Sequence, residues 1–206
     1  MFIKICGLRE PGHVTTAVAA GADAVGFVLT ESPRQVTPAQ ARALAALVPP
    51  GTETVAVFGG LPVAGVRAVL AGGGFSAVQL HGAYPRADFA ALRDLEVKLV
   101  RAVPHAGATE LCCGAFGEDL LLVDAVIPGS GQPWEWHDLA DRPQGRWLLA
   151  GGLRPGNVAA ALHAARPWGV DVSSGVEASR GVKDPALIRE FISAARDAAR
   201  QLPQLQ

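Results

Sequence analysis

Phe2-Ile3-Lys4-Ile5-Cys6-Gly7 opens the chain as a short β-rich run that ends at a thiol. Seven further β-rich runs follow, and their starts lie about 20 to 30 residues apart. That spacing accommodates one strand, one helix and two short loops. The eight expected strands are Phe2-Cys6, Ala24-Leu29, Thr54-Phe58, Ala77-His81, Lys98-Val103, Leu120-Ala125, Trp147-Ala150 and Gly169-Ser173.

Helix signals fill the segments between these runs. Thr37-Pro38 is typical of an N-cap followed by a first-turn proline, and predicts a helix over Ala39-Val48. Further helices are expected over Pro62-Leu70, Pro85-Leu92, Pro155-Ala165 and about Asp184 to Gln201, and Cys112-Cys113 are expected to pack within a helix.

Eight strand–helix units without a break in composition predict one (β/α)8 barrel, a TIM barrel, over residues 1–206. This α/β fold usually needs about 250 residues and about 200 at the least. A doubly wound open sheet is the alternative. Even spacing favours the closed barrel, and the first strand is not followed by the Gly-x-Gly-x-x-Gly turn of dinucleotide-binding folds.

The composition narrows the class of protein. Half of the residues are hydrophobic and the net charge is −1, which gives no electrostatic reason to expect binding to nucleic acid or to a membrane surface. No apolar run is long enough for a transmembrane helix, and no signal peptide is evident. Three cysteines, two of them adjacent, imply neither a disulfide framework nor a zinc site. A cytoplasmic protein without a metal is expected.

Strand alternation places several polar side chains at the mouth of the barrel, where such folds carry their active sites. Lys4 and Cys6 face the interior, Asp124 ends the sixth strand, and Gln79 and His81 end the fourth. A lone strand cysteine is more often a packing residue than a catalyst. A buried aspartate is either in a structural salt bridge or functional, so both alternatives stay open for each residue.

Two glycine-rich turns predict a phosphate site. Gly151-Gly152 follow the seventh strand and Ser174-Gly175 follow the eighth, and the loops after these two strands are the frequent phosphate site of such barrels. Arg34, after the second strand, is either a solvated loop residue or a fork for a carboxylate or phosphate.

Taken together, these segments resemble the phosphoribosylanthranilate isomerase family, and the resemblance covers essentially the whole chain. It is carried by Lys4-Gly7, Gly21-Phe27, Ser32-Arg34, Val78-Gly82, Leu122-Asp124, Gly151-Leu153 with Pro155 and Asn157, and Val170-Glu177.

The resemblance implies an Amadori rearrangement, the third step of tryptophan biosynthesis from chorismate. N-(5-phosphoribosyl)anthranilate becomes 1-(2-carboxyphenylamino)-1-deoxyribulose 5-phosphate, without a cofactor. Cys6 falls on the family's general base, Asp124 falls on its general acid, and Arg34 is expected to pair with the anthranilate carboxylate. Lys4, on the face of Cys6, is expected to favour the thiolate. The other implied substrate-binding positions are Gln79, His81, Asp171, Gly151, Gly152, Ser173, Ser174 and Gly175.

The sequence departs from the family pattern in two loops. Phe58-Gly59-Gly60 lacks the Asn or Asp that relatives often carry there, and the segment Gly129-Trp136 has lost a lysine and gained bulk at Gln132-Trp136. These departures bear on loop closure and substrate affinity rather than on the acid and base.

Other functions remain open on the sequence. A histidine-pathway aminoaldose isomerase, or an enzyme with both activities, is one alternative, although that family's first-strand base is an aspartate. A non-catalytic phosphosugar-binding barrel is another, but it has no need of Cys6 and Asp124 together. The expected partner is the small phosphosugar-anthranilate substrate, and the expected assembly is a monomer or weak homodimer.

Overall fold

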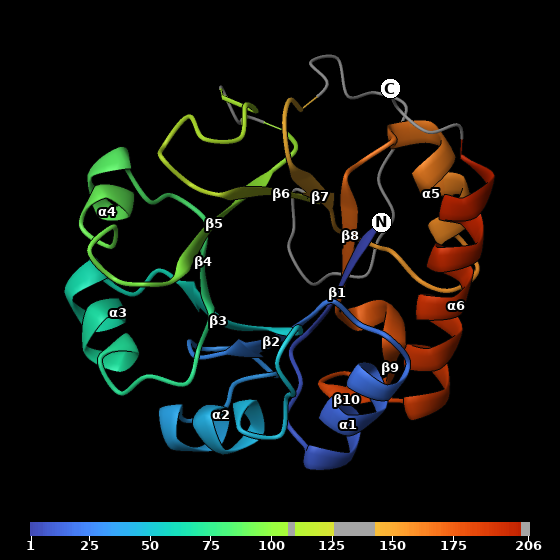
Figure 1. Ribbon diagram of the computed structural model, residues 1–206, viewed down its shortest axis with the longest axis horizontal. Helices are drawn as coiled ribbons and strands as arrows, with labels where there is room; N and C mark the ends of the chain where they lie inside the picture. Colours follow the sequence, from blue (N-terminus) through green and yellow to red (C-terminus); the bar gives the residue numbers. More distant parts are fainter. Residues whose placement is uncertain (107–109, 126–142, 203–206) are drawn as a thin grey trace.

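The computed structural model describes residues 1–106, 110–125 and 143–202, and it confirms the closed barrel. Eight parallel strands pair in chain order, and β8 closes the ring against β1 (Figure 1). The strands are β1 (Phe2–Cys6), β2 (Ala24–Val28), β3 (Glu53–Gly59), β4 (Ala77–His81), β5 (Lys98–Pro104), β6 (Leu120–Asp124), β7 (Trp147–Leu149) and β8 (Gly169–Val172).

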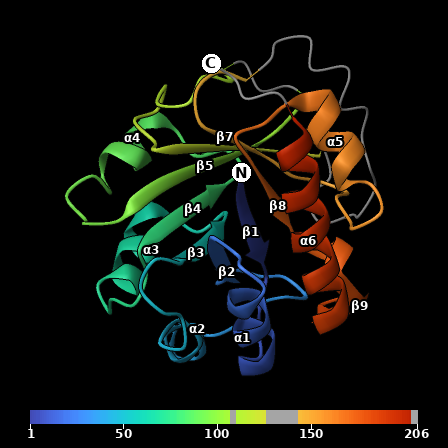
Figure 2. The same ribbon diagram turned by 45° about the vertical axis from the view of Figure 1, so that its right-hand side comes forward.

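Six α-helices of the described residues cover the outside of the ring (Figure 1). The longest, α6, packs against both α5 and α1 and so joins the last unit of the barrel to the first (Figure 2). The helices are α1 (Pro11–Ala19), α2 (Pro38–Ala45), α3 (Val63–Leu70), α4 (Arg86–Ala90), α5 (Val158–Ala165) and α6 (Pro185–Gln201).

Local sequence explains where two of the helices begin. Thr37 and Gln40 form the reciprocal hydrogen bonds of a capping box at the start of α2, as Thr37-Pro38 predicted. At α6 the Asp184 carboxylate accepts from the backbone N–H groups of Ala186 and Leu187. Such caps satisfy backbone donors that a helix leaves free in its first turn.

The predicted helix at Cys112-Cys113 is wrong. The described residues 110–119 form turns and one isolated bridge, from Cys112 to Gln144. Gly114 and Gly117 adopt positive φ angles, which interrupt a helix. The buried Arg101 guanidinium holds this segment in place, because it is bound to the Glu118 carboxylate at 2.7 Å and donates to two carbonyl groups of the segment.

Two elements lie outside the eight units that the sequence predicts. A 3-10 turn, η2 (Ser174–Val176), follows β8, and a short antiparallel hairpin of β9 (Glu177–Ser179) and β10 (Val182–Lys183) follows it. The helix α5 begins at Val158 rather than at Pro155, because Asn157 bonds back to the loop through Arg154 N–H and the Gly152 carbonyl.

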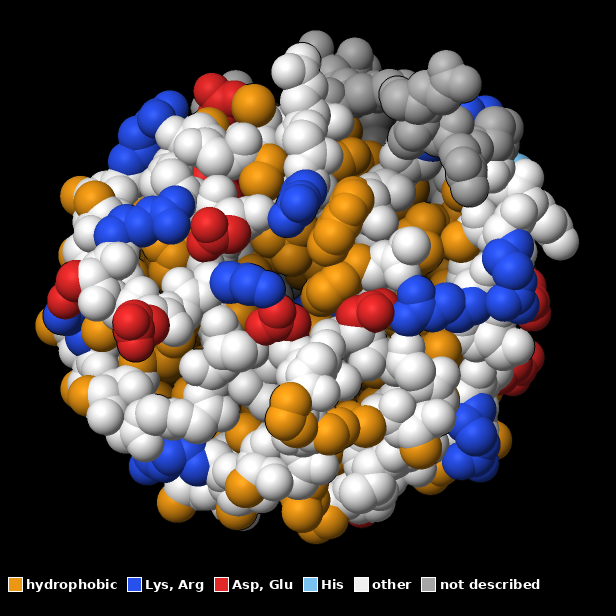
Figure 3. Space-filling view, in the orientation of Figure 1, with side chains coloured by type: hydrophobic (Ala, Val, Ile, Leu, Met, Phe, Trp, Pro, Cys, Tyr) orange, Lys and Arg blue, Asp and Glu red, His pale blue; other side chains and the backbone are white. Residues whose placement is uncertain are grey.

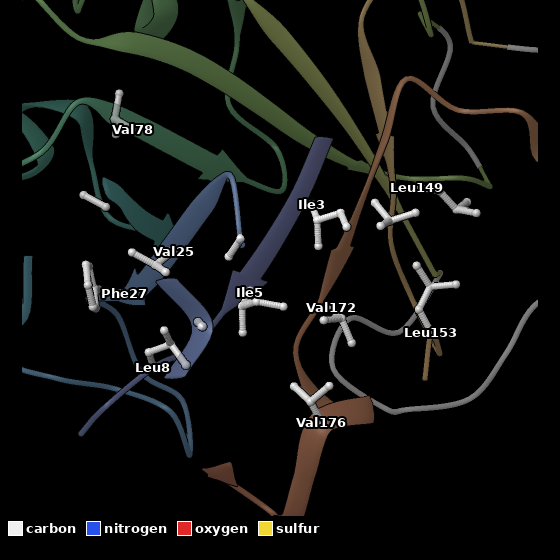
Figure 4. Close-up of a cluster of buried hydrophobic side chains, with 14 of the residues drawn as sticks. Ile3, Ile5, Leu8, Val25, Phe27, Val78, Leu149, Leu153, Val172 and Val176 are labelled. Carbon is white, nitrogen blue, oxygen red and sulfur yellow. The ribbon is translucent and has the colours of Figure 1, made fainter. Parts of the chain in front are cut away.

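Strand alternation divides the core into an outer and an inner part. Ile3, Ile5 and Leu8 belong to a continuous apolar cluster between the strands and the helices (Figure 4). Burial of one such side chain contributes about 1.5–3 kcal/mol. Inside the ring, Cys6 packs in one small cluster and Leu122 in another. The predicted faces of β1 and β6 are therefore confirmed.

Candidate active site

A cavity of about 220 Å³ lies at the carboxyl ends of the strands. Five of the eight strands supply polar or reactive groups to its wall at the last positions of the strand or directly after it. The lining residues are Cys6, Val28, Thr30, Glu31, Ser32, Arg34, Val57, Phe58, Gly59, Gln79, His81, Asp124, Asp171 and Ser173. The strand ends thus bring together polar and reactive side chains that are far apart in the sequence.

Cys6 is the last residue of β1, and its side chain is buried inside the ring. A Cβ placed on Gly26 of the neighbouring strand would lie 2.9 Å from Cys6 Sγ and 3.3 Å from Lys4 Nζ, so the absence of a side chain at Gly26 makes room for both groups. Burial raises the pKa of the Cys6 thiol, while the Lys4 ammonium, and at longer range that of Lys183, act in the opposite direction. Ionisation of the Cys6 thiol therefore depends on its lysine neighbours.

Asp124 ends β6 and is 8% exposed. Burial raises the pKa of this carboxyl to about 6, although the Ala125 backbone N–H donates to its Oδ1 at 2.7 Å. In the described residues no lysine or arginine forms a salt bridge with it, and the ion-pair neighbour found there is the His81 ring, 3.9 Å away. A carboxyl with this pKa is partly protonated near neutral pH and can donate a proton.

Two polar groups of β4 point into the cavity without hydrogen-bond partners in the described part of the chain. These are Gln79 Oε1 and His81 Nε2, both buried atoms. His81 Nε2 lies 3.9 Å from Asp124 Oδ2, which is too long for a hydrogen bond. Burial lowers the pKa of His81, so its ring is neutral at pH 7. Unsatisfied buried groups of this kind are expected where a ligand binds.

Arg34 lies in the loop after β2 and is only 8% exposed, so the solvated alternative is wrong. Its Nε and Nη2 donate to the two oxygens of Glu177, at 2.6 Å and 3.0 Å. Nη1 has no hydrogen bond in the described part of the chain. Since a guanidinium has five N–H donors, the edge formed by Nη1 and Nη2 can still bind a carboxylate.

The two glycine turns lie against each other. A Cβ on Gly175 would lie 1.7 Å from the Leu153 carbonyl oxygen, so the loop after β8 touches the loop after β7. Gly151 has a φ of +84°, and a Cβ there would lie 2.8 Å from Asp124 Oδ1. The turns therefore form one surface that borders Asp124.

The structure brings together seven of the eleven predicted site residues in the lining of the cavity: Cys6, Arg34, Gln79, His81, Asp124, Asp171 and Ser173. The other four, Gly151, Gly152, Ser174 and Gly175, lie in the two adjoining turns and not in the lining. Of the two departures from the family pattern, Gly59 lines the cavity, whereas Gln132-Trp136 lies outside the described residues.

Sequence reasoning assigned no role to Glu177 or Lys183. Lys183 Nζ lies 2.8 Å from Glu177 Oε1 and also donates to the Ser173 carbonyl and hydroxyl. Both side chains are at least 95% buried, at 5% and 1% exposed. One signal was available, because Lys183 is one of three lysines in the chain.

A second hollow, of about 190 Å³, lies at the other end of the ring, where the strands begin. Figure 3 looks towards this end and shows hydrophobic side chains in the central hollow with basic and acidic groups around it. Its carboxylates are paired, Glu53 with Lys98 and Asp119 with Arg93. Its lining contains no cysteine or histidine, whereas the cavity at the carboxyl ends of the strands contains Cys6 and His81.

Two other kinds of feature are absent from the described residues. No described helix is both long and apolar enough to cross a membrane. No cluster of three or more His, Cys, Asp or Glu side chains in residues 1–106, 110–125 and 143–202 has the arrangement of a metal site.

Known proteins resemble this chain over nearly its full length. Residues 3–194 match the family described as N-(5'phosphoribosyl)anthranilate (PRA) isomerase. A curated N-(5'-phosphoribosyl)anthranilate isomerase from Paracoccus denitrificans is 44% identical, with 94% of this chain and 96% of the relative covered.

Solved structures agree with the sequence match. The crystal structure of TrpF from Jonesia denitrificans is 47% identical, with a TM-score of 0.89 and coverage of 97% of this chain and 98% of that one. A phosphoribosyl anthranilate isomerase in complex with reduced 1-(o-carboxyphenylamino)-1-deoxyribulose 5-phosphate is 32% identical, with a TM-score of 0.82 and coverage of 96% and 99%.

Proposed function

Because the chain belongs to the N-(5'-phosphoribosyl)anthranilate isomerase family, we propose that Cys6 and Asp124 carry out its reaction as general base and general acid. The protein is an isomerase of tryptophan biosynthesis. Its substrate is proposed to be N-(5-phosphoribosyl)anthranilate and its product 1-(2-carboxyphenylamino)-1-deoxyribulose 5-phosphate, at the third step from chorismate. The observation that carries the assignment of roles is the buried Asp124, whose pKa of about 6 suits a proton donor, in one cavity with a buried thiol.

The first step is ring opening. Asp124, in its protonated form, donates a proton to the furanose ring oxygen, and the bond from that oxygen to C1′ breaks as the anthranilate nitrogen supplies its electron pair. The product of this step is a Schiff base. General acid catalysis of such a step is worth about 10²–10⁴-fold.

The second step is proton abstraction. The Cys6 thiolate removes the proton from C2′, and the electrons neutralise the Schiff base to give an enolamine, which tautomerises to the ketone. The reaction needs the acid protonated and the base ionised at the same time. Burial raises both pKa values, which favours the acid form of Asp124 and leaves ionisation of Cys6 dependent on Lys4.

The rest of the cavity is proposed to hold the substrate. Arg34 pairs with the anthranilate carboxylate through its free edge, and the adjoining turns at Gly151 and Gly175 hold the 5′-phosphate with backbone N–H groups. Gln79 Oε1 and His81 Nε2, which have no partners in the described part of the chain, are proposed to bond to sugar hydroxyls. The remaining proposed substrate-binding residues are Gly152, Asp171, Ser173 and Ser174.

A fluorescence assay that follows the disappearance of the anthranilate substrate tests these roles. We expect Cys6→Ala and Asp124→Ala each to reduce kcat by at least about 10²-fold. Activity that survives in both variants would show that the acid and the base lie elsewhere. Complementation of a tryptophan auxotroph lacking this step tests the function in cells.

A separate turnover assay addresses the alternative of a second activity. The aminoaldose substrate of the histidine pathway is the probe for a bifunctional enzyme, and the presence of Cys6 rather than an aspartate at the end of β1 leads us to expect no turnover of it. The assembly state, a monomer or weak homodimer, stays a prediction, and so does the cytoplasmic location.

A further inference from the structure

We propose that the β9–β10 hairpin selects for the aromatic carboxylate of the substrate, with Glu177 and Lys183 as positioning residues that hold Arg34 in its binding orientation. The proposal rests on the function proposed above. The hairpin lies outside the eight strand–helix units, and its own residues do not line the cavity.

The first contact is the pair between Arg34 and Glu177. The two side chains make two roughly parallel hydrogen bonds, Nε to Oε1 at 2.6 Å and Nη2 to Oε2 at 3.0 Å. Such a bidentate pair fixes the plane of the guanidinium as well as its position. It occupies one edge of Arg34 and leaves the adjacent edge for a second carboxylate.

The second contact prevents Glu177 from turning away. Its Oε1 also accepts from Lys183 Nζ at 2.8 Å, and its Oε2 accepts from the Gly181 backbone N–H at 3.0 Å. The other protons of the Lys183 ammonium go to the carbonyl and hydroxyl of Ser173. With all of these donors engaged and both side chains buried, rotation of Glu177 would leave several buried groups unsatisfied.

The backbone of the hairpin lies in close contact with the loop that carries Arg34. A Cβ on Gly181, whose φ is +84°, would lie 2.6 Å from the Pro33 carbonyl oxygen. Arg9 Nη1 donates to that same oxygen at 3.0 Å and reaches the Gly181 carbonyl at 3.5 Å. On the barrel side, a Cβ on Gly7 would lie 2.7 Å from Arg34 Cδ. The arginine is thus enclosed between the end of β1 and the hairpin.

The charges of these buried side chains also favour a carboxylate ligand. Arg34, Glu177 and Lys183 are buried together and comprise two basic groups and one acidic group, although burial lowers the pKa of Lys183. Although burial alone raises the pKa of Glu177, hydrogen bonds from Arg34 and Lys183 lower it to about 2, so the glutamate stays ionised at neutral pH. An excess of one basic group over the acidic group suits the single negative charge of an aryl carboxylate.

The test compares two substrates that differ only in this carboxylate: N-(5-phosphoribosyl)anthranilate and N-(5-phosphoribosyl)aniline. We expect Glu177→Gln to raise KM for the first substrate about tenfold or more, with kcat changed much less, because the charge-assisted bonds that orient Arg34 are weakened. For the aniline substrate KM should change less than about threefold.

Glu118→Gln is the matched control. Glu118 also accepts from an arginine Nε at 2.7 Å and from a backbone N–H, and its side chain is fully buried, but it lies outside the cavity. This variant should treat the two substrates alike. If Glu177→Gln does not fold, Glu177→Asp takes its place, since it keeps the charge but is too short to hold both arginine nitrogens, and it should raise KM for the anthranilate substrate alone.

Equal KM changes for both substrates in the Glu177 variant would show that the hairpin has only a structural role, and would overturn the proposal. An unchanged KM for both substrates would also overturn it. Failure of the proposed function looks different, because the wild-type protein would then turn over neither substrate.

Discussion

Lys4 Nζ lies 2.7 Å from Asp171 Oδ1, in an ion pair buried inside the barrel one layer below Cys6. Burial by itself lowers the pKa of Lys4, but the Asp171 carboxylate beside it holds that pKa above its ordinary value, so the ammonium stays charged. A buried ion pair is weak grounds for stability, because desolvation offsets much of the attraction. Its place next to the thiol of Cys6 is what connects it with the chemistry.

The pair predicts opposite effects on Cys6 when each partner is removed. Lys4→Met should raise the pKa of the Cys6 thiol further, because it removes the ammonium that favours the thiolate, and so slow alkylation of Cys6 at pH 8. Asp171→Asn should lower that pKa, because the Asp171 carboxylate opposes ionisation of the thiol. The measurement is the pH dependence of alkylation in a Cys112→Ser, Cys113→Ser background, which leaves Cys6 as the only thiol. Shifts in the same direction for both variants would contradict this account.

The raised pKa of Asp124 predicts how the stability of the protein changes with pH. Its pKa is about 6 in the folded protein against an ordinary 3.8, so folding favours its protonated form. The charged form is therefore destabilising: the penalty is absent below about pH 3.8, grows up to about pH 6 and is complete above that. Asp124→Asn should raise the free energy of unfolding by about 1–3 kcal/mol at pH 8 and change it little at pH 4.

Urea unfolding of the wild type and of Asp124→Asn at these two pH values measures this difference. The amide oxygen of asparagine can still accept the bond from the Ala125 N–H, so the variant changes charge more than structure. Asp124→Asn less stable than the wild type at pH 8 would mean that the charged carboxylate is not destabilising.

The barrel could be predicted from the sequence because its signal is local. The spacing of apolar residues and the turn residues indicate each strand and helix. Alternation along β1 and β6 then places Cys6 and Asp124 inside the ring. The segment 110–119 was mispredicted for a physical reason. Its shape depends on the buried Arg101, which lies on another element and whose contacts no local pattern reveals.

The same limit applies to the site. Arg34 and Glu177 are 143 positions apart, and only the fold brings them together. The sequence identified Arg34 as a candidate but supplied neither its burial nor its partner. Glu177 was visible within the motif Val170-Glu177, yet a motif does not say which side chain a residue will contact.

Gly26→Ala tests whether the proposed base, Cys6, must keep its position. A Cβ there would lie 2.9 Å from Cys6 Sγ and 3.3 Å from Lys4 Nζ, so Gly26→Ala must displace both groups. We expect it to cost about 1–3 kcal/mol of stability and to lower kcat about tenfold or more. Gly12→Ala is the control, because Gly12 lies in α1 with open space around it, and alanine there should stabilise by about 0.5–1 kcal/mol. Unchanged kcat in Gly26→Ala would show that the position of the thiol tolerates movement.

Gly175 tests whether the two glycine turns act as one phosphate site. A Cβ there would lie 1.7 Å from the Leu153 carbonyl oxygen, and since that neighbour is backbone, Gly175→Ala must move the loops after β7 and β8 apart. We expect KM for the phosphosugar substrate to rise about tenfold or more, and inhibition by inorganic phosphate to weaken equally. Gly156→Ala, in the same loop as Leu153 but with open space around it, should leave both unchanged. The rate of Cys6 alkylation reports on the proposed base independently, and it should stay at its wild-type value because the displaced loops lie at the proposed phosphate end of the site. Phosphate inhibition as strong in Gly175→Ala as in the wild type would mean that the two turns do not bind the phosphate together.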